Sequence, residues 1–407
     1  MEVIVVGGGA SGLIAAGMAA ARGYRVTVVE RNPRMARKVM ITGKGRCNVT
    51  NAATVQDCVE NTPGNGKFLY SAFSAFSPQD TMAFFEEQGV PLKTERGNRV
   101  YPVSDKAVDI VDALVSFAKK QGCRFKQGRV TRLMIEDGVC CGVALDNGET
   151  LSAYAVIVCT GGCSYPGTGS TGDGYTLAEQ AGHTVIEPRP SLVGLSIADE
   201  WCADLQGLSL KNCALAVKDT QNGKTVYTDF GEMLFTHYGI SGPIVLSASA
   251  HLHGAVNGRY CLSLDMKPAL TLEQVDARLV REFEQAPNTC VGNTLAALLP
   301  RSMVLVMLQL SGVAGETKCH SVSKAQRGAI AALLKNIPVT VAGLRPFEEA
   351  VVTAGGVSTR EIKASTMESK LVSGLYFACE VIDVDAYTGG FNLQIAFSTG
   401  YVAGNNV

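Results

Sequence analysis

The sequence predicts an α/β fold in which a parallel sheet is followed by a β-meander and a second domain is inserted before the chain returns to the first. Three observations support this. An apolar run, Val3–Val6, ends in a turn of glycines. Short strand-like runs alternate with turn residues through 124–159. Finally, Gly389-Gly390 precedes a last helical stretch of small and apolar residues.

The glycine turn has the order that a dinucleotide site requires. Gly7 takes the tight turn, Gly9 lets the backbone approach a pyrophosphate, and Gly12 lets the helix pack on the strand. The N–H groups and the positive dipole end of the helix then face the phosphates. Glu30 closes the next apolar run and is placed to accept hydrogen bonds from a ribose. The segment therefore predicts a Rossmann-like nucleotide-binding domain.

The length and the net charge of the chain limit the classes of protein to which it can belong. The 407 residues suggest about two or three domains. A formal net charge of -1 gives no sign of a nucleic-acid partner or of an anionic membrane surface. No apolar run approaches the ~20 residues of a membrane span, and Glu2 with the glycines breaks any signal-peptide pattern. We therefore expect a cytoplasmic protein that acts on a small-molecule substrate.

The thirteen cysteines favour buried free thiols over metal or disulfide sites. Their number is odd, no Cys-x-x-Cys occurs, and several lie inside apolar strand-like runs. The five histidines form no cluster with metal-ligand spacing. The sequence thus predicts no metal site.

Changes of composition along the chain suggest three segments. Residues 1–190 read as the first part of the nucleotide domain, and Pro188 and Pro190 mark its end. Residues 191–346 combine strand-like stretches with helical patterns and form the inserted substrate or cap domain. Residues 347–407 return to the nucleotide domain with a strand, an acid, two glycines and a helix. The insert is expected to be β-barrel-like with additional helices.

Five motifs resemble one bacterial flavoprotein family, the BaiN-type or aminoacetone oxidase family of FAD-binding enzymes, with a glutathione-reductase-like fold. They are Thr42-Gly-Lys-Gly-Arg-Cys-Asn-Val-Thr-Asn51, Gly167-Thr-Gly-Ser-Thr-Gly-Asp-Gly-Tyr175, Leu234-Phe-Thr-His-Tyr-Gly-Ile-Ser-Gly-Pro243, Thr366-Met-Glu-Ser-Lys370 and Asp383-Val-Asp-Ala-Tyr-Thr-Gly-Gly-Phe-Asn-Leu-Gln394. The likeness covers essentially the whole chain. Cys379 and Ala386 stand where the family commonly has glycine.

The resemblance implies FAD as the cofactor and assigns residues to each part of it. The resemblance implies that the pyrophosphate is bound by Gly7, Gly9, Ala10, Ser11 and Gly12, and the adenosine ribose by Glu30 and Arg31. Val130 is assigned to the adenine, and Thr160, Gly161 and Gly162 to the AMP half. The residues implied to contact the ribityl chain and the flavin ring are Lys38, Gly45, Arg46, Cys47, Asn48, Glu380, Asp385, Gly390, Asn392 and Leu393.

Two features of these motifs allow more than one interpretation. Gly167–Gly172 also matches a dinucleotide pattern and could bind NAD(P), but residues 163–166 separate it from the preceding strand, which favours a loop bordering the flavin. Cys47 could serve as a redox thiol, but no second cysteine is arranged beside it, which favours a packing role.

The predicted activity is an FAD-dependent oxidoreductase that reduces an activated C=C bond in a small apolar, steroid-like or bile-acid-like carbonyl compound. NAD(P)H is the candidate transient electron donor. His237 and Tyr238, in the inserted domain, are the candidate catalytic proton donors, although a structural role at a hinge is the simpler interpretation. The alternatives are a flavin oxidase of amines or amino ketones, and a flavin-bound module that modifies RNA or a protein.

Overall fold

The chain folds into two compact units, and the computed structural model describes all residues, 1–407. Unit 1 comprises Met1–Ser191 and Pro346–Val407, and unit 2 comprises Leu192–Arg345. Each unit has its own hydrophobic core.

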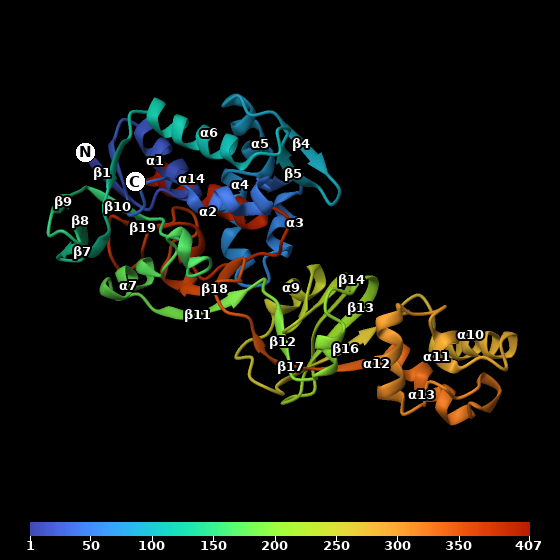
Figure 1. Ribbon diagram of the computed structural model, residues 1–407. Helices are drawn as coiled ribbons and strands as arrows, with labels where there is room; N and C mark the ends of the chain where they lie inside the picture. The colour runs from blue at the N-terminus through green and yellow to red at the C-terminus, as the bar shows by residue number, and fades with distance from the viewer. The chain divides into compact units, whose positions relative to one another are not determined.

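Unit 1 is built on a five-stranded parallel sheet of order β19-β10-β1-β2-β6. Its central strand β1 pairs on one side with β2 and on the other with β10, and every β10 residue is buried. Strand β19, from the C-terminal segment, extends the sheet beside β10 (Figure 1). The strands are β1 (Glu2–Val6), β2 (Arg25–Glu30), β6 (Arg124–Gln127), β10 (Ala155–Val158) and β19 (Leu375–Phe377).

Two helices from opposite ends of the chain pack closely in unit 1. Helix α1 (Ala10–Ala21) follows the glycine turn, and α14 (Phe391–Asn406) ends the chain. A Cβ on Gly400 would lie 2.4 Å from the Ser11 carbonyl oxygen, and one on Gly404 would lie 2.4 Å from that of Ala15. These glycines of α14 therefore allow direct backbone contact with α1. Further helices of unit 1 are α2 (Arg37–Ile41), α3 (Val55–Glu60), α4 (Tyr70–Ala75), α5 (Pro78–Glu87), α6 (Ala107–Lys120) and α7 (Asp173–Gln180).

Three smaller sheets complete unit 1. Within the run 124–159 that predicts a meander, only β7, β8 and β9 form an antiparallel sheet, whereas β6 and β10 at its two ends join the parallel sheet. The first turn of this smaller sheet has positive φ at Asp137 and Gly138, as a two-residue hairpin requires. A second sheet has the order β3-β5-β4, and β11 pairs with β18 in the third. The bounds are β3 (Thr50–Asn51), β4 (Leu92–Glu95), β5 (Arg99–Pro102), β7 (Val130–Glu136), β8 (Val139–Leu145), β9 (Thr150–Ser152), β11 (Val185–Ser191) and β18 (Val352–Val357).

Unit 2 is a closed antiparallel barrel of order β12-β15-β14-β13-β16-β17 with added helices. Alternate residues of β13 and β16 are buried, because successive side chains point to opposite faces of a strand. The strands are β12 (Leu195–Ile197), β13 (Ser209–Asp219), β14 (Thr225–Thr236), β15 (Gly239–Ser241), β16 (Tyr260–Asp265) and β17 (Ile337–Leu344). The helices are α8 (Trp201–Asp204), α9 (Pro243–Ser249), α10 (Leu272–Gln285), α11 (Val291–Leu295), α12 (Arg301–Ser311) and α13 (Lys324–Lys335).

The α/β fold with a meander and a barrel-like insert is confirmed, whereas several element bounds differ from the sequence pattern. The sequence has a helical pattern around Leu295–Leu310, but the structure has two helices there, because Pro300 cannot continue a helix and instead caps α12. The run Leu375–Glu380 has the pattern of a strand, but the strand ends at Phe377, because Cys379 has φ +72 and begins a short 3₁₀ turn. The sequence pattern predicts a strand over Thr225–Tyr227 only, but β14 continues to Thr236.

Candidate functional site

A deep cleft in unit 1 lies beyond the carboxyl ends of β1, β2 and β10. Its space, including the part open to solvent, is about 1190 Å³. Parallel α/β sheets bind their ligands at this edge, because the loops there connect strands to helix N-termini. The predicted residues that line the cleft are Gly7, Gly9, Ala10, Ser11, Glu30, Arg31, Lys38, Val130, Thr160, Gly161, Glu380, Asn392 and Leu393.

The glycines of the first turn have three different steric roles. Gly7 has φ +101, and a Cβ there would lie 2.5 Å from the Cys159 carbonyl oxygen. A Cβ on Gly12 would lie 1.9 Å from the Gly7 carbonyl oxygen, so this glycine holds helix α1 against the turn. Gly9 caps α1 with an ordinary φ of -83, and a Cβ there meets nothing within 4 Å. The space in front of Gly9 therefore belongs to the cleft.

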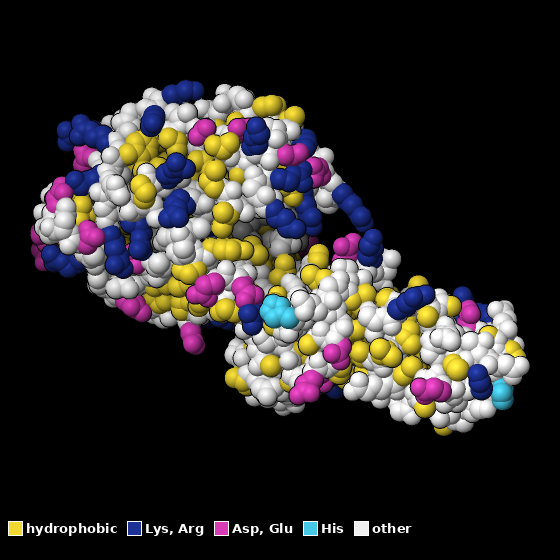
Figure 2. Space-filling model, viewed as in Figure 1, with side chains coloured by type: hydrophobic (Ala, Val, Ile, Leu, Met, Phe, Trp, Pro, Cys, Tyr) yellow, Lys and Arg dark blue, Asp and Glu magenta, His cyan; other side chains and the backbone are white.

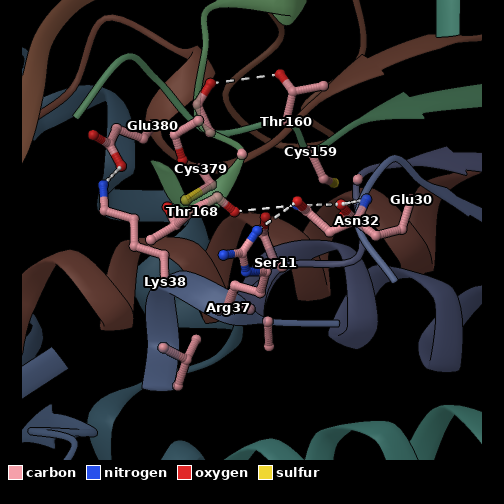
Figure 3. A pocket seen from close by; sticks show the side chains of 18 of the residues that line it. Ser11, Glu30, Asn32, Arg37, Lys38, Cys159, Thr160, Thr168, Cys379 and Glu380 are labelled. Atoms are coloured by element: carbon pink, nitrogen blue, oxygen red, sulfur yellow. Dashed lines mark hydrogen bonds and ion pairs between the residues drawn. The ribbon is translucent and has the colours of Figure 1, made fainter. Parts of the chain in front are cut away.

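Glu30 organises one wall of the cleft (Figure 3). It is 8% exposed, and its Oε2 accepts the Gly8 amide at 2.8 Å. Its Oε1 accepts the backbone amide of Asn32 at 2.8 Å and the side-chain amide at 2.7 Å. Because a carboxylate can accept about four hydrogen bonds, one acceptor position on Oε2 is left for a ligand.

An ion pair between distant segments forms another wall. Lys38 Nζ of α2 lies 2.8 Å from Glu380 Oε2, as Figure 3 shows. The other oxygen of Glu380 accepts hydrogen bonds from Ser164 Oγ at 2.8 Å and from the Thr353 amide at 2.7 Å. This network ties the C-terminal segment of unit 1 to its N-terminal part across the cleft edge.

Three predicted glycine positions lie outside the cleft lining and serve packing. Gly12 supports the turn, because its lack of a side chain lets α1 contact the Gly7 carbonyl oxygen. Gly162 lies against Thr353, whose Oγ1 would be 2.5 Å from an added Cβ. Gly390, with φ +101, caps α14 and lies against the backbone of Thr50.

The predicted residues Gly45, Arg46, Cys47, Asn48 and Asp385 also lie outside the cleft lining. Arg46 instead binds Glu95 and Asp105 through Nη2, at 2.5 and 2.6 Å. Asp385 is buried and accepts a hydrogen bond from Ser191 Oγ at 2.7 Å. Asn48 Oδ1 is buried without a hydrogen-bond partner, which leaves an acceptor for a group from outside the protein. The cofactor roles of these five residues stay predictions.

The cleft is also lined by the loop predicted to border the flavin and by one residue, Asn32, that the sequence did not indicate. Thr168, Gly169 and Ser170 belong to the second glycine motif and line the same cleft as Gly9, so both motifs border a single site. Asn32 also lines it and bonds the Thr168 carbonyl at 3.1 Å. The pattern of Gly167–Gly172 was a signal for this loop, whereas nothing in the sequence distinguishes Asn32 from a surface residue.

The thiols near the cleft are held in their protonated form. Burial raises the pKa of Cys379 to about 11 and raises that of Cys159 further. Burial also raises the pKa of Cys47 to about 12. Thiolates are the nucleophilic form of cysteine, so these values favour packing roles over redox chemistry.

The cleft fits an extended dinucleotide. It reaches the N-terminus of α1 through Gly9–Ser11 and the N-terminus of α14 through Asn392 and Leu393. Arg31, Arg34, Arg37, Lys38 and Arg129 give it more basic than acidic side chains. Free N–H groups at one helix, a second helix at the far end and basic walls suit a pyrophosphate carrying a group at each side.

The candidate proton donors lie in unit 2. His237 and Tyr238 form the turn between β14 and β15, where His237 is exposed and Tyr238 is half-buried. Their rings are 5.0 Å apart in an edge-to-face arrangement, and the Arg345 guanidinium lies 4.3 Å from the centre of the Tyr238 ring. This contact fixes the tyrosine ring at the turn.

A family model described as the HI0933-like protein Rossmann domain matches residues 1–406. The chain belongs to this family. It is therefore a flavoprotein oxidoreductase with an FAD-binding Rossmann domain, as the resemblance implied.

The similarity to known proteins extends over nearly the whole chain. A 3-dehydro-bile acid delta(4,6)-reductase of Clostridium scindens is 32% identical over 98% of this chain and 97% of its own length. A ribosomal RNA dihydrouridine synthase of Haemophilus influenzae is also 32% identical, over 98% of this chain and 96% of its own length. The solved Mycobacterium smegmatis Sdh1 complex in the apo form shares the fold, with a TM-score of 0.50 and 18% identity over 99% of this chain and 67% of that one.

Two further structural findings concern metals and membranes. No group of three or more His, Cys, Asp and Glu side chains is arranged to hold a metal ion. None of the helices has the length and apolar character needed to cross a bilayer.

Proposed function

We propose that this protein is an FAD-dependent reductase of a ring C=C bond conjugated with a carbonyl group. The observation that carries the proposal is the pair of full-length relatives. Their names describe different substrates, a 3-oxo steroid skeleton and the uracil ring of RNA, but the same reaction, addition of hydrogen across a C=C bond next to a carbonyl. A shared reaction is the best supported property of a chain equally similar to both.

The cleft residues would hold the cofactor by its phosphates and its ribose. Once bound and reduced by two electrons, FAD would supply a hydride to an electron-poor carbon. Gly9 leaves room for the pyrophosphate, and the N-terminus of α1 stabilises its charge. The remaining acceptor on Glu30 binds a ribose hydroxyl, and Asn392 orders the start of α14 by bonding the Ala386 amide and carbonyl. Tight positioning of this kind is the main contribution of a protein to cofactor chemistry.

Two classes of substrate contain such a conjugated C=C bond and are candidates here. The bile-acid relative favours a small apolar steroid-like carbonyl compound. The dihydrouridine synthase favours a uridine in ribosomal RNA. Residues 91–106 of unit 1, which contain four Lys and Arg but only two acids, support that choice. We propose the conjugated carbonyl ring as their common recognition element.

We also propose NAD(P)H as electron donor and His237 or Tyr238 as the proton donor to the second carbon of the reduced bond. Both side chains carry a transferable proton and lie on one turn. That the section 191–346 covers the substrate also stays a prediction. The cytoplasm is the proposed compartment, since all thirteen cysteines are free thiols.

The test is an anaerobic two-step experiment on the purified holoprotein. NADH, NADPH or dithionite first reduces the flavin, and the loss of its 450-nm absorbance is followed. A 3-oxo-Δ4 steroid or a uridine-containing ribosomal RNA fragment is then added. Return of the oxidised spectrum with formation of the hydrogenated product supports the proposal.

Other outcomes would select the alternatives. Hydrogen peroxide formed in air on adding an amine or amino ketone, with no reduction of either C=C substrate, would indicate the oxidase. A flavin bleached by dithionite but by neither nicotinamide would remove NAD(P)H as donor and leave the reductase in place.

A further inference from the structure

Two segments of unit 1 concentrate positive charge, although the chain as a whole has a formal net charge of -1. Residues 31–56 contain six Lys and Arg and no Asp or Glu, and residues 91–106 contain four Lys and Arg and two acids. Figure 2 shows Lys and Arg side chains gathered over the β4–β5 hairpin of this unit. The balanced total therefore conceals a local excess of positive charge.

The fold joins these segments through an ion-pair network. Arg46 binds Glu95 and Asp105, and Lys93 binds the same Asp105 at 2.7 Å. Strand β3 of the first segment pairs with β5 of the second, with Thr50 opposite Val100. Both acids of the region are thus already engaged by Arg46 and Lys93.

Four exposed cations surround this network and make no ion pair. Lys44 lies on the 3₁₀ turn η1 (Thr42–Gly45), two residues before Arg46. Its φ is +59, and it and the two neighbouring glycines adopt the left-handed conformation. Arg96 adjoins Glu95, Arg99 lies opposite Glu95 across the β4–β5 hairpin, and Lys106 adjoins Asp105. Since the nearby carboxylates are occupied, the charge of these four residues is available to a partner. We call Lys44, Arg96, Arg99 and Lys106 the basic surface.

The basic surface is fixed next to the predicted ring end of the cleft. Asn51 Nδ2 donates to the Gly97 carbonyl of the hairpin at 3.1 Å and to the Gly389 carbonyl at 3.0 Å. Gly389 lies just before α14, whose residues Asn392 and Leu393 line the cleft. One side chain thus connects the basic hairpin to the start of the helix that borders the cleft.

We infer that the basic surface binds the phosphate backbone of a structured RNA, so that the ring reduced at the cleft is a base within that RNA. Unpaired Lys and Arg on one face are the electrostatic footprint of nucleic-acid binding, and a neutral steroid has no phosphate to occupy them. This inference rests on the proposed C=C reduction and names its substrate class. An anionic lipid surface could also attract these cations and is an outcome of the test.

The experiment compares the full-length holoprotein with two variants of equal charge change. The test variant combines Lys44→Gln, Arg96→Gln, Arg99→Gln and Lys106→Gln. The control combines Lys119→Gln, Lys120→Gln, Arg124→Gln and Arg132→Gln, which are also exposed residues of unit 1. Binding to a fluorescent ribosomal RNA fragment is measured by anisotropy from about 50 to 200 mM salt, with duplex DNA and phosphatidylserine vesicles as competitors.

We expect the test variant to bind RNA at least about tenfold more weakly than the wild type. The slope of log affinity against log salt concentration should become less steep by about 3, since each phosphate contact contributes about 0.7–0.9 to its magnitude. The control should keep most of the slope. Equal RNA affinity of test variant and wild type, or a wild-type preference for the vesicles, would overturn the inference.

Failure of the inference and failure of the proposed function can be distinguished. Both variants and the wild type are reduced with dithionite and mixed with a small cyclic enone. Reoxidation by the enone without RNA binding would leave the reductase and remove the RNA surface. Salt-dependent RNA binding without reduction of enone or uridine would leave the RNA surface and remove the proposed reductase.

Discussion

Gly9 shows how one residue can matter to the ligand and little to the fold. Its φ is accessible to any residue, and an added Cβ meets no protein atom. Gly7 and Gly12 differ, because a Cβ on either collides with backbone. The three glycines of one motif therefore separate into two that shape the turn and one that leaves room for the cofactor.

Gly9→Ala should weaken FAD binding by about tenfold or more, which is ~1.4 kcal/mol, because the methyl group enters the space of the pyrophosphate. The free energy of unfolding of the apoprotein should change by less than about 1 kcal/mol, the scale of a changed N-cap. FAD fluorescence titration and urea unfolding measure the two quantities. Gly328→Ala, which also meets nothing within 4 Å, is the control. Unchanged FAD affinity of the Gly9 variant would place the phosphates elsewhere.

Glu30→Gln should destabilise the apoprotein as well as weaken FAD binding. The carboxylate accepts three donors, from Gly8 and Asn32, and one amide oxygen cannot serve all of them in the same geometry. A buried donor left unpaired costs about 1–3 kcal/mol. Urea unfolding of the apoprotein should show this loss. Glu149→Gln breaks only an exposed pair with Lys126 and should cost about 1 kcal/mol or less. Equal stability of the two variants would contradict the role of Glu30 in the turn.

His237→Gln and Tyr238→Phe test the proton donor. The variant that removes the donor should slow reoxidation of the reduced flavin by substrate about 100-fold, the lower range for general acid catalysis. Reduction of the flavin by dithionite should be unchanged. Stopped-flow absorbance separates the two half-reactions. Wild-type reoxidation rates in both variants would leave only a structural role for this turn.

At the scale of elements, the contact of α1 with α14 connects the two ends of the chain. Gly400 and Gly404 are one turn apart on α14 and both face backbone carbonyls of α1. Small residues at this spacing allow two helices to approach closely. The position of α14, and with it the far end of the cleft, thus depends on the absence of two side chains.

Gly404→Ala should lower the free energy of unfolding by about 1–3 kcal/mol, the usual cost of overpacking. The added Cβ would lie 2.4 Å from the Ala15 carbonyl oxygen, so the helices must separate. Gly328→Ala in α13 should instead raise stability by up to about 1 kcal/mol. Thermal unfolding of both variants makes the comparison. A Gly404 variant as stable as wild type would show that the helix pair adapts.

At the scale of the whole molecule, a buried histidine joins the returning segment to the first part of unit 1. His183 Nε2 lies 2.8 Å from Ser369 Oγ, and Nδ1 lies 3.2 Å from Glu361 Oε2. Because Ser369 Oγ also accepts the amides of Leu371 and Val372, its proton must be donated to Nε2. The network therefore requires a neutral imidazole protonated at Nδ1.

Burial lowers the pKa of His183 below its ordinary 6.5, although Glu361 opposes this. The folded state thus binds this proton less well than the unfolded state. Its stabilising contribution is present above about pH 6.5 and is lost as the pH falls below that value. Urea unfolding of wild type and His183→Gln from pH 8 to 5 should show a decline that the variant lacks. His320→Gln, at an exposed site, should keep the decline. A decline of equal size in all three proteins would assign it to other groups.

Much of the nucleotide half could be predicted from the sequence, because its signals are local. The order of Val3–Gly12 encodes strand, turn and helix within ten residues, and Asp137-Gly138 encodes a hairpin. Such patterns depend on φ preferences and on the period of apolar residues, which a linear chain displays directly. The ends of elements differ from the sequence pattern where one residue breaks it, as Cys379 does after β19 and as Pro300 does in unit 2.

The sequence by itself determined the α/β fold, the family and most of the cleft, since adjacent residues set backbone shape. Only the tertiary structure decided that Arg46 faces Glu95 and Asp105 and that Asn32 lines the cleft. It also decided that two basic segments some fifty residues apart form one surface. Charge acts through space, so a balanced total along the chain cannot show where the fold concentrates it.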